Sequence, residues 1–580
     1  MAEIHRKYKD RVYTTYLLRR SYRQHGQVKQ QTLGNLSHLP PQTIRLVRES
    51  LKGVAFVPLE QRMEITRSRH HGHVAAVRAM LRQLKLHRLI DPEPSRWRDL
   101  VEAMIVARVV EPDTKLATCR WWHATTLPED LGSTDATQDE LYAAMDWLVA
   151  RQDRIERRLA RRHLSDEGLV LYDVTSTSYE GSHCPLARFG HSRDGKRGKR
   201  QIVFGLVTDG QGRPVALEVY AGNTADPHTV SDQVYKLKAR FGLRRVVLAA
   251  DRGMLTSVRL EELKKLEGLD WISALRAPAI RRLMDQEIIQ PSLFDERDLM
   301  EVRSPEFPGE RLVVCRNPCL AEERRRKREE LVLATEKLLE RLARRVAAGR
   351  LKRREKIGQA LGRVINRYEV AKHFCCEINE GRFTWRRDEE SIRREAALDG
   401  FYVLRTSVPS EAMPAVAVVA GYKSLSHVER AFRTYKSVDL RVRPIHHRLE
   451  DRVRAHIFLC MLAYYVEWHL REAWAPLLFD DELPGQHVDG SPVKPAVRSE
   501  SALTKAQTRK QANGQPVHSF QTLLAELSTV VRNTAWIPAC PEAGTFELLT
   551  APTPLQREAF ERVGLCSLED RRQNRRASIA

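Results

Sequence analysis

Two short apolar stretches, each followed by a carboxylate, do most to limit how this chain can fold. The first is Leu169-Val-Leu-Tyr-Asp173 and the second is Arg245-Val-Val-Leu-Ala-Ala-Asp251. Their apolar and β-branched residues predict two buried strands that end at the acid. A hairpin signal at Asp209-Gly-Gln-Gly212 and a helical stretch then lie between them. Because a strand-helix-strand crossover places parallel strands side by side, we expect Asp173 and Asp251 to share one edge of a sheet.

A third carboxylate stands in the segment 421–436. If this segment is a helix, residues at spacings of three, four or seven share one face; these are Tyr422, Leu425, Glu429, Arg433 and Lys436. Taken alone, Asp173 is interpreted as a structural ion-pair partner and Glu429 as part of a salt-bridge ladder, because a buried charge needs compensation. Together, the three acids are what two-metal phosphoryl transfer requires, since Mg²⁺ prefers oxygen ligands and paired ions activate the nucleophile and stabilise the leaving oxygen.

The charge of the chain points to a polyanionic partner. It contains 97 Lys and Arg against 75 Asp and Glu, a net charge of +22. Clustered cations displace the counterions condensed on nucleic acid, although general solubility is the simpler explanation. A Gly-rich basic loop at 187–200 can lie against a phosphate backbone or simply be solvated. Its candidate DNA contacts are Arg193, Lys196, Arg197, Lys199 and Arg200.

Cysteine usage and apolar runs indicate the compartment. Nine cysteines at irregular spacing form no disulfide framework, which suits a reducing cytoplasm. The pairs Cys315/Cys319 and Cys375/Cys376 are poorly spaced for zinc and are interpreted as ordinary thiols. The longest apolar run, 457–466, is far shorter than the roughly 20 residues of a membrane span, and no signal peptide is evident. We expect a cytoplasmic, nucleoid-associated protein without a membrane partner, and a buried helix at 457–466.

Length and local pattern divide the chain into six regions. These are 1–60, a basic β-hairpin element for DNA binding; 61–165, a helical region; 166–276, the first half of a core; 277–398, an inserted sub-domain with a charged helical arm; 399–475, the second half of the core; and 476–580, a C-terminal helical region and tail. Two short helices meet at Glu111-Pro112-Asp113, with Asp113 as a plausible N-cap, and form either a helix-turn-helix or ordinary bundle packing. The arm is either a solvated helix or a contact to DNA or a second subunit.

The segment Tyr422-x2-Leu425-x3-Glu429-x6-Lys436 resembles the Tyr-x2-Arg-x3-Glu-x6-Lys signature of DDE transposases of bacterial insertion sequences, in the IS-four-like superfamily. Three of the four positions match. The Arg position is Leu425, and Arg433 on the same face is the candidate replacement. Asp173 with its following Thr-Ser, and Asp251 with its following Arg-Gly-Met, are similar to the first two acids of the family. The resemblance covers roughly residues 165–470.

The resemblance implies an α/β fold (α+β overall), with an RNase H-like mixed-sheet core interrupted by an insertion and flanked by helical N-terminal and C-terminal regions. Asp173, Asp251 and Glu429 would be the catalytic residues and would bind two divalent ions, Mg²⁺ or Mn²⁺. Tyr422 and Lys436 would hold phosphate near the scissile bond, and Arg433, Arg252 and the basic loop would contact DNA.

The expected reaction is hydrolysis of a phosphodiester at each transposon end, followed by attack of the freed 3′-hydroxyl on target DNA. The partners would be double-stranded DNA, as terminal inverted repeats and target, and at least a second copy of the chain. One alternative is an RNase H-like nuclease without strand transfer. Another is a catalytically inactive DNA-binding regulator, which the intact set of three acids disfavours.

Overall fold

The computed structural model describes residues 1–9, 11–54, 63–193, 195–196, 198–290, 294–437, 439–482, 486–487, 492–493, 496–538 and 544–565. Arg197, one of the predicted DNA contacts, lies outside these residues. The chain forms two compact units, one of Met1–Arg69 with Val531–Thr550 and one of His70–Val530 with Ala551–Ala580.

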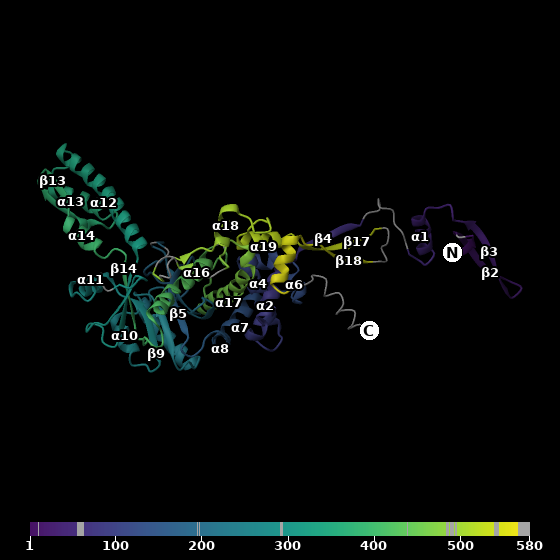
Figure 1. Ribbon diagram of the computed structural model, residues 1–580, viewed down its shortest axis with the longest axis horizontal. Coiled ribbons are helices and arrows are strands. Elements are labelled where there is room, and N and C mark those ends of the chain that lie inside the picture. The colour runs from purple at the N-terminus through teal and green to yellow at the C-terminus, as the bar shows by residue number, and fades with distance from the viewer. Residues whose placement is uncertain are drawn as a thin grey trace. The chain divides into compact units, whose positions relative to one another are not determined.

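The larger unit contains an eight-stranded mixed sheet (Figure 1). In order across the sheet, its strands are β10 (Leu299–Val302), β11 (Arg311–Arg316), β14 (Phe401–Thr406), β9 (Leu269–Ala274), β8 (Val246–Ala250), β5 (Leu169–Ser178), β6 (Gln201–Asp209) and β7 (Pro214–Ala221). β5, β8 and β9 pair in parallel, and every other neighbouring pair is antiparallel. The predicted mixed α/β class is therefore confirmed, as is the hairpin of β6 and β7.

Helices cover both faces of the sheet near β5. On one face, α9 (Asp226–Tyr235), its π-helical continuation η1 (Lys236–Arg240) and α10 (Ser257–Leu263) pack against alternate residues of the strands, in one apolar cluster. That cluster includes Val170, Tyr172 and Val174 of β5. On the other face lie α16 (Leu425–Lys436), which contacts β5, and α17 (Glu450–Trp474), which contacts β7. Because side chains alternate along a strand, Asp173 and Thr175 point toward α16.

A helical bundle precedes the sheet and surrounds α17. Its members are α2 (Gly72–Gln83), α3 (Leu86–Ile90), α4 (Arg96–Val110), α5 (Lys115–Trp122), α6 (Leu127–Asp130), α7 (Gln138–Val149) and α8 (Gln152–His163). Every residue of α4 from Leu100 to Val110 is buried, so bundle packing accounts for this helix. The predicted N-cap Asp113 is wrong: the hydroxyl of Thr114 caps α5 by accepting from the N–H of Ala117.

The buried helix predicted at 457–466 is confirmed as part of α17, and every residue of this stretch is buried. Among the residues that the structure describes, no helix is long and apolar enough to cross a membrane.

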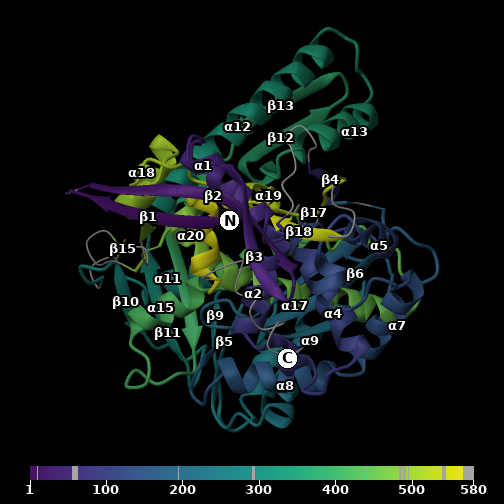
Figure 2. The same cartoon turned by 90° about the vertical axis from the view of Figure 1, so that its right-hand side faces the viewer.

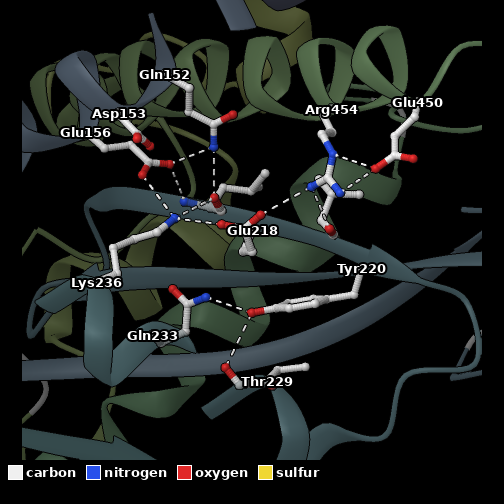
Figure 3. Close-up of polar contacts among 12 residues, drawn as sticks. Gln152, Asp153, Glu156, Glu218, Tyr220, Thr229, Gln233, Lys236, Glu450 and Arg454 are labelled. Carbon is white, nitrogen blue, oxygen red and sulfur yellow. Dashed lines mark hydrogen bonds and ion pairs between the residues drawn. The ribbon is translucent and has the colours of Figure 1, made fainter. Parts of the chain in front are cut away.

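A buried network of ion pairs and hydrogen bonds connects α8 of the bundle and α17 to β7 (Figure 3). Lys236 of η1 lies 3.1 Å from carboxylate oxygens of both Glu156 on α8 and Glu218 on β7. Glu218 also pairs with Arg454 of α17 at 3.2 Å. Glu156 accepts further hydrogen bonds from the N–H of Leu217 and from the Gln152 side chain. Burial alone would lower the pKa of Lys236, but Glu156 and Glu218 raise it, so its ammonium stays charged.

The charged arm has its own apolar core. Its helices and its hairpin lie at the top of Figure 2. It consists of α12 (Pro318–Ala347), α13 (Arg354–Ile365), η3 (Ala371–His373), β12 (Phe374–Asn379), β13 (Arg382–Arg387) and α14 (Glu389–Ala396). The sequence of residues 374–385 predicts a hairpin, and the pairing of β12 with β13 confirms it. The charged pattern of residues 322–356 predicts one continuous helix for the arm. This prediction is too long, because α12 ends at Ala347 and Gly349, with a φ of +70°, turns the chain in a left-handed conformation.

The smaller unit is built from β-sheets. β1 (Ala2–Tyr8), β2 (Arg11–Gln24) and β3 (Gln27–Asn35) form one sheet, followed by α1 (Pro41–Ser50), and β4 (Glu64–His70), β17 (Val531–Trp536) and β18 (Thr545–Leu549) form another. The β-hairpin predicted within residues 1–60 is confirmed, and the turn at His25-Gly26 joins β2 to β3. The remaining elements are α11 (Ala277–Asp285), α15 (Ala415–Lys423), η4 (Ala475–Leu477), β15 (Gln486–His487), β16 (Ala496–Val497), α18 (Glu500–Thr508), α19 (Phe520–Ser528) and α20 (Pro554–Arg562). The division into six regions stays a prediction.

Candidate active site

Asp173 and Asp251 follow the last residue pair of the parallel ladder between β5 and β8. That pair is Tyr172 with Ala250, so each acid is the next residue of its chain segment. β8 ends before Asp251, as predicted. The prediction that β5 ends at Asp173 is wrong, because residues 174–178 continue to pair with β6 after β8 has ended. Asp173 is therefore a mid-strand residue beside the carboxyl end of its neighbour.

The three predicted acids line one cavity of about 510 Å³. Asp173 and Asp251 enter it from the sheet and Glu429 from α16. Asp173 is half-buried, whereas Asp251 and Glu429 are exposed. The other lining residues are Asn317, Tyr402, Tyr422, Lys423, Leu425, Ser426 and Val493.

The electrostatics of the cavity disfavour three bare carboxylates. The pKa of Asp173 is raised to about 6, first by burial and then by the charges of Asp251 and Glu429. The N–H of Val174, which donates to Oδ1 of Asp173 at 2.7 Å, acts in the opposite direction. A cation bound beside these carboxylates would offset the repulsion that Asp173 experiences.

Tyr422 joins the signature segment to the second acid. Its hydroxyl donates to Oδ1 of Asp251 at 3.3 Å. Burial and the charge of Asp251 raise the pKa of Tyr422. The phenol therefore remains protonated and can act only as a donor to this carboxylate at neutral pH.

The residues of the cavity suit a divalent metal by their chemistry. Three carboxylates provide the oxygen ligands that Mg²⁺ prefers. Among the described residues, no three His, Cys, Asp or Glu side chains are placed so that they could hold a metal ion together. Mg²⁺ sites in phosphoryl-transfer enzymes use one or two carboxylates, with waters and substrate phosphate completing the shell, so such a protein cage is not required.

A second cavity, of about 490 Å³, lies at the end of α16. Lys436 lines it, and Nζ of Lys436 lies 2.5 Å from Oγ1 of Thr175 on β5. The other lining residues are Ser178, Glu180, Lys196, Ser437, Arg441, Arg443 and Pro444. Four cations against one carboxylate give this cavity a positive charge that suits a phosphate.

The cations of the basic loop differ in their surroundings. Arg193 pairs with Asp226, Lys199 pairs with Glu180 at 2.8 Å, and the guanidinium of Arg200 donates to the carbonyl of Ser182 at 3.0 Å. Lys196 instead faces the second cavity. Arg252 is exposed, and its charge partly opposes the rise in the pKa of Tyr422.

The signature segment is two helices, not the single predicted helix. Tyr422 belongs to α15, and α16 begins at Leu425. Between them, the hydroxyl of Ser424 donates to the carbonyl of Ala420 at 2.9 Å, a bond that competes with the helical backbone. Leu425 lies in the wall of the first cavity, while Arg433 is exposed and lines neither cavity.

Several lining residues were not predicted from the sequence. Asn317 and Tyr402 reach the first cavity from the segments that flank the arm, and no motif marks them. Arg441 and Arg443 line the second cavity, and the only signal for them was the dense run of cations after Lys436.

Two family models match parts of the sequence. Residues 164–466 match the transposase DDE domain, and residues 2–56 match the N-terminal domain of IS1634 family transposases. The chain belongs to the DDE transposase family. DDE transposases depend on divalent metal ions, which fits the three acids of the first cavity.

Two solved structures of transposases are similar to the chain at low sequence identity. The cryo-EM structure of the piggyBac transposase synaptic complex with hairpin DNA is 9% identical, with a TM-score of 0.33 over 87% of this chain and 81% of that one. The Mos1 transposase paired-end complex with the left transposon end is 12% identical, with a TM-score of 0.14 over 42% of this chain and 70% of that one. No curated protein matches the sequence.

Proposed function

We propose that this transposase binds the terminal inverted repeats of its own insertion sequence, cleaves the phosphodiester at each end and joins the freed 3′-hydroxyls to target DNA. The observation that carries the proposal is that Asp173, Asp251 and Glu429 line one cavity at the end of a parallel ladder. The order β7-β6-β5-β8-β9, with two antiparallel and two parallel pairings, supports an RNase H-like core within the larger sheet.

In this proposal, Asp173, Asp251 and Glu429 hold two Mg²⁺ or Mn²⁺ ions. Such ions, when bound, activate the attacking oxygen and neutralise charge on the leaving one. Tyr422 orients Asp251 through its hydrogen bond, and Lys436, anchored near Thr175, holds a phosphate beside the cavity. Arg252, Arg433 and the basic loop contact the DNA backbone.

Two transposon ends need two active sites, so we propose that at least a dimer acts on the paired ends. A cytoplasmic, nucleoid-associated location follows from the same function. The DNA beside the gene provides an inexpensive check, because inverted repeats bordered by short direct repeats are expected there.

The experiment compares the full-length chain with Asp173→Asn, Asp251→Asn and Glu429→Gln variants on duplex DNA that carries these repeats. We expect each change to reduce Mg²⁺-dependent cleavage by about 10³-fold or more, because several kcal/mol of charge stabilisation is lost, while binding persists. Ser426→Ala, which alters the same cavity without removing a charge, is the matched control and should cleave normally. Undiminished cleavage by the acid variants would refute the proposed metal site.

A joining assay separates the alternatives. Strand transfer predicts that cleaved ends become covalently linked to a target plasmid. A nuclease without strand transfer would leave cleaved but unjoined ends, and an inactive regulator would bind without cleaving.

A further inference from the structure

In the N-terminal sheet, β1 and β3 pair with different halves of β2. β1 pairs with the first half of β2, from Tyr8 opposite Arg11 to Ala2 opposite Leu17. β3 pairs with the second half, from Leu17 to Gln24. β2 is thus shared by two consecutive two-stranded ribbons that overlap only around Leu17. The strands β1, β2 and β3 are drawn in purple in Figure 2.

The second of these, residues 19–32, is here called the recognition ribbon. A bulge at Leu33 separates it from the overlap, since Leu18 pairs with Gly34 but Arg19 pairs with Thr32. Every residue of the ribbon is exposed on both faces. A two-stranded hairpin without a covered apolar face is only marginally stable in water, so this ribbon is suited to gain contacts from a partner.

The charge of the ribbon identifies the chemistry of that partner. Residues 19–32 contain four Arg and Lys and no Asp or Glu, in a chain where acids are otherwise frequent. Such a surface is complementary to a polyanion. Six residues of antiparallel strand extend about 20 Å, and the major groove of duplex DNA, about 12 Å wide, admits a two-stranded ribbon.

The two faces of the ribbon carry different side chains, because directly paired residues of antiparallel strands lie on the same face. One face has the pairs Arg20/Gln31, Tyr22/Lys29 and Gln24/Gln27, and the other has Arg19/Thr32, Ser21/Gln30 and Arg23/Val28. On the second face, Arg19 donates to the side-chain carbonyl of Gln30 at 3.3 Å. The first face presents three glutamines, an arginine and a lysine, which are the side chains that form bidentate or charged contacts with adenine and guanine edges.

We propose that the recognition ribbon enters the major groove of duplex DNA and reads base edges with Arg20, Gln24, Gln27, Lys29 and Gln31. The inference rests on the proposed function, because it takes DNA as the partner. It adds which groove is contacted, which face contacts it and which residues select the sequence.

The test uses the full-length chain without divalent metal, so that binding is measured independently of cleavage. A randomised duplex library is selected for binding at fixed salt, with the wild type, Gln31→Ala and Gln30→Ala. Gln30 is the neighbour of Gln31 on the opposite face and therefore a matched control. Far-UV circular dichroism checks that these exposed substitutions preserve folding.

We expect the wild type and Gln30→Ala to enrich the same motif. Gln31→Ala should bind that duplex about tenfold more weakly and lose the preference at one or two positions, with unchanged affinity for a scrambled duplex. Replacing purines of the motif by their 7-deaza forms, which lack the N7 acceptor in the major groove, should weaken the wild type but have less effect on Gln31→Ala at the base that Gln31 contacts.

Three results would overturn the inference: no enriched motif, an unchanged motif with Gln31→Ala, or indifference to 7-deaza purines. If the ribbon serves only as a charged strand edge that prevents association, neither Gln31→Ala nor Gln30→Ala would change the selected motif. If the chain cleaves end DNA but Gln31→Ala leaves the selected motif unchanged, only this inference is refuted. If Gln31→Ala changes the motif but the chain cleaves no DNA, only the proposed function is refuted.

Discussion

The hydroxyl of Tyr422 lies 3.3 Å from Oδ1 of Asp251 and donates a hydrogen bond to it. Helix α15, which follows the arm in the sequence, therefore positions Asp251, which precedes the arm. This contact engages one carboxylate oxygen of Asp251, a residue that lines the first cavity. Its consequence can be measured by removing the hydroxyl alone.

Tyr422→Phe should lower the rate of end cleavage by about tenfold or more, because a hydrogen bond to a charged group contributes roughly 1.5–3 kcal/mol. The Mg²⁺ concentration needed for half-maximal cleavage should rise, since Asp251 is less well oriented. Tyr402→Phe, which changes a second tyrosine of the same cavity, is the control and should retain the wild-type requirement. An unchanged metal requirement in Tyr422→Phe would show that the hydroxyl does not position Asp251.

The sequence predicted the parts of this site that depend on local pattern. Apolar runs located β5 and β8, and the spacing of Glu429 and Lys436 placed both on one helix. It did not predict that β5 continues beyond Asp173, because the length of a strand is set by its neighbour β6, a partner distant in sequence. Asn317 and Tyr402 were missed for the same reason: only the folded chain brings the flanks of the arm to the cavity.

Lys436→Ala tests the second cavity as a phosphate site. Loss of one phosphate contact should weaken binding to all duplexes alike and reduce the slope of log K against log salt by about 1. Titrations of the full-length chain at several salt concentrations measure this slope. Lys265→Ala removes an exposed cation outside both cavities and should leave the slope unchanged. Equal slopes for both variants would contradict a phosphate contact at Lys436.

Lys236→Met should destabilise the larger unit by about 3–5 kcal/mol. The substitution leaves Glu156 fully buried without its cation, and an uncompensated buried charge costs that much. Urea denaturation of the full-length chain measures the change. The double variant Glu156→Gln/Lys236→Met removes both charges and should recover part of the loss. A double variant less stable than Lys236→Met would show that the network acts through packing and not through charge.

Glu467 should make stability depend on pH. Burial in α17 raises its pKa to about 7, against the opposing influence of Arg471, so the folded chain holds a proton that the unfolded chain releases above its ordinary value of 4.5. The folded state therefore binds more protons between these two values, and the stability contributed by Glu467 is complete below pH 4.5 and is lost as the pH rises through about 7. Glu467→Gln keeps a neutral side chain and should be more stable than the wild type at pH 8, by up to about 3 kcal/mol, but not at pH 4.5.

Denaturation of the wild type and Glu467→Gln across this pH range measures the difference. Glu472→Gln, an exposed change on the same helix, is the control and should follow the wild type at every pH. If Glu467→Gln is instead less stable than the wild type at pH 8, the ion pair with Arg471, at 2.8 Å, outweighs burial and Glu467 is charged in the folded chain.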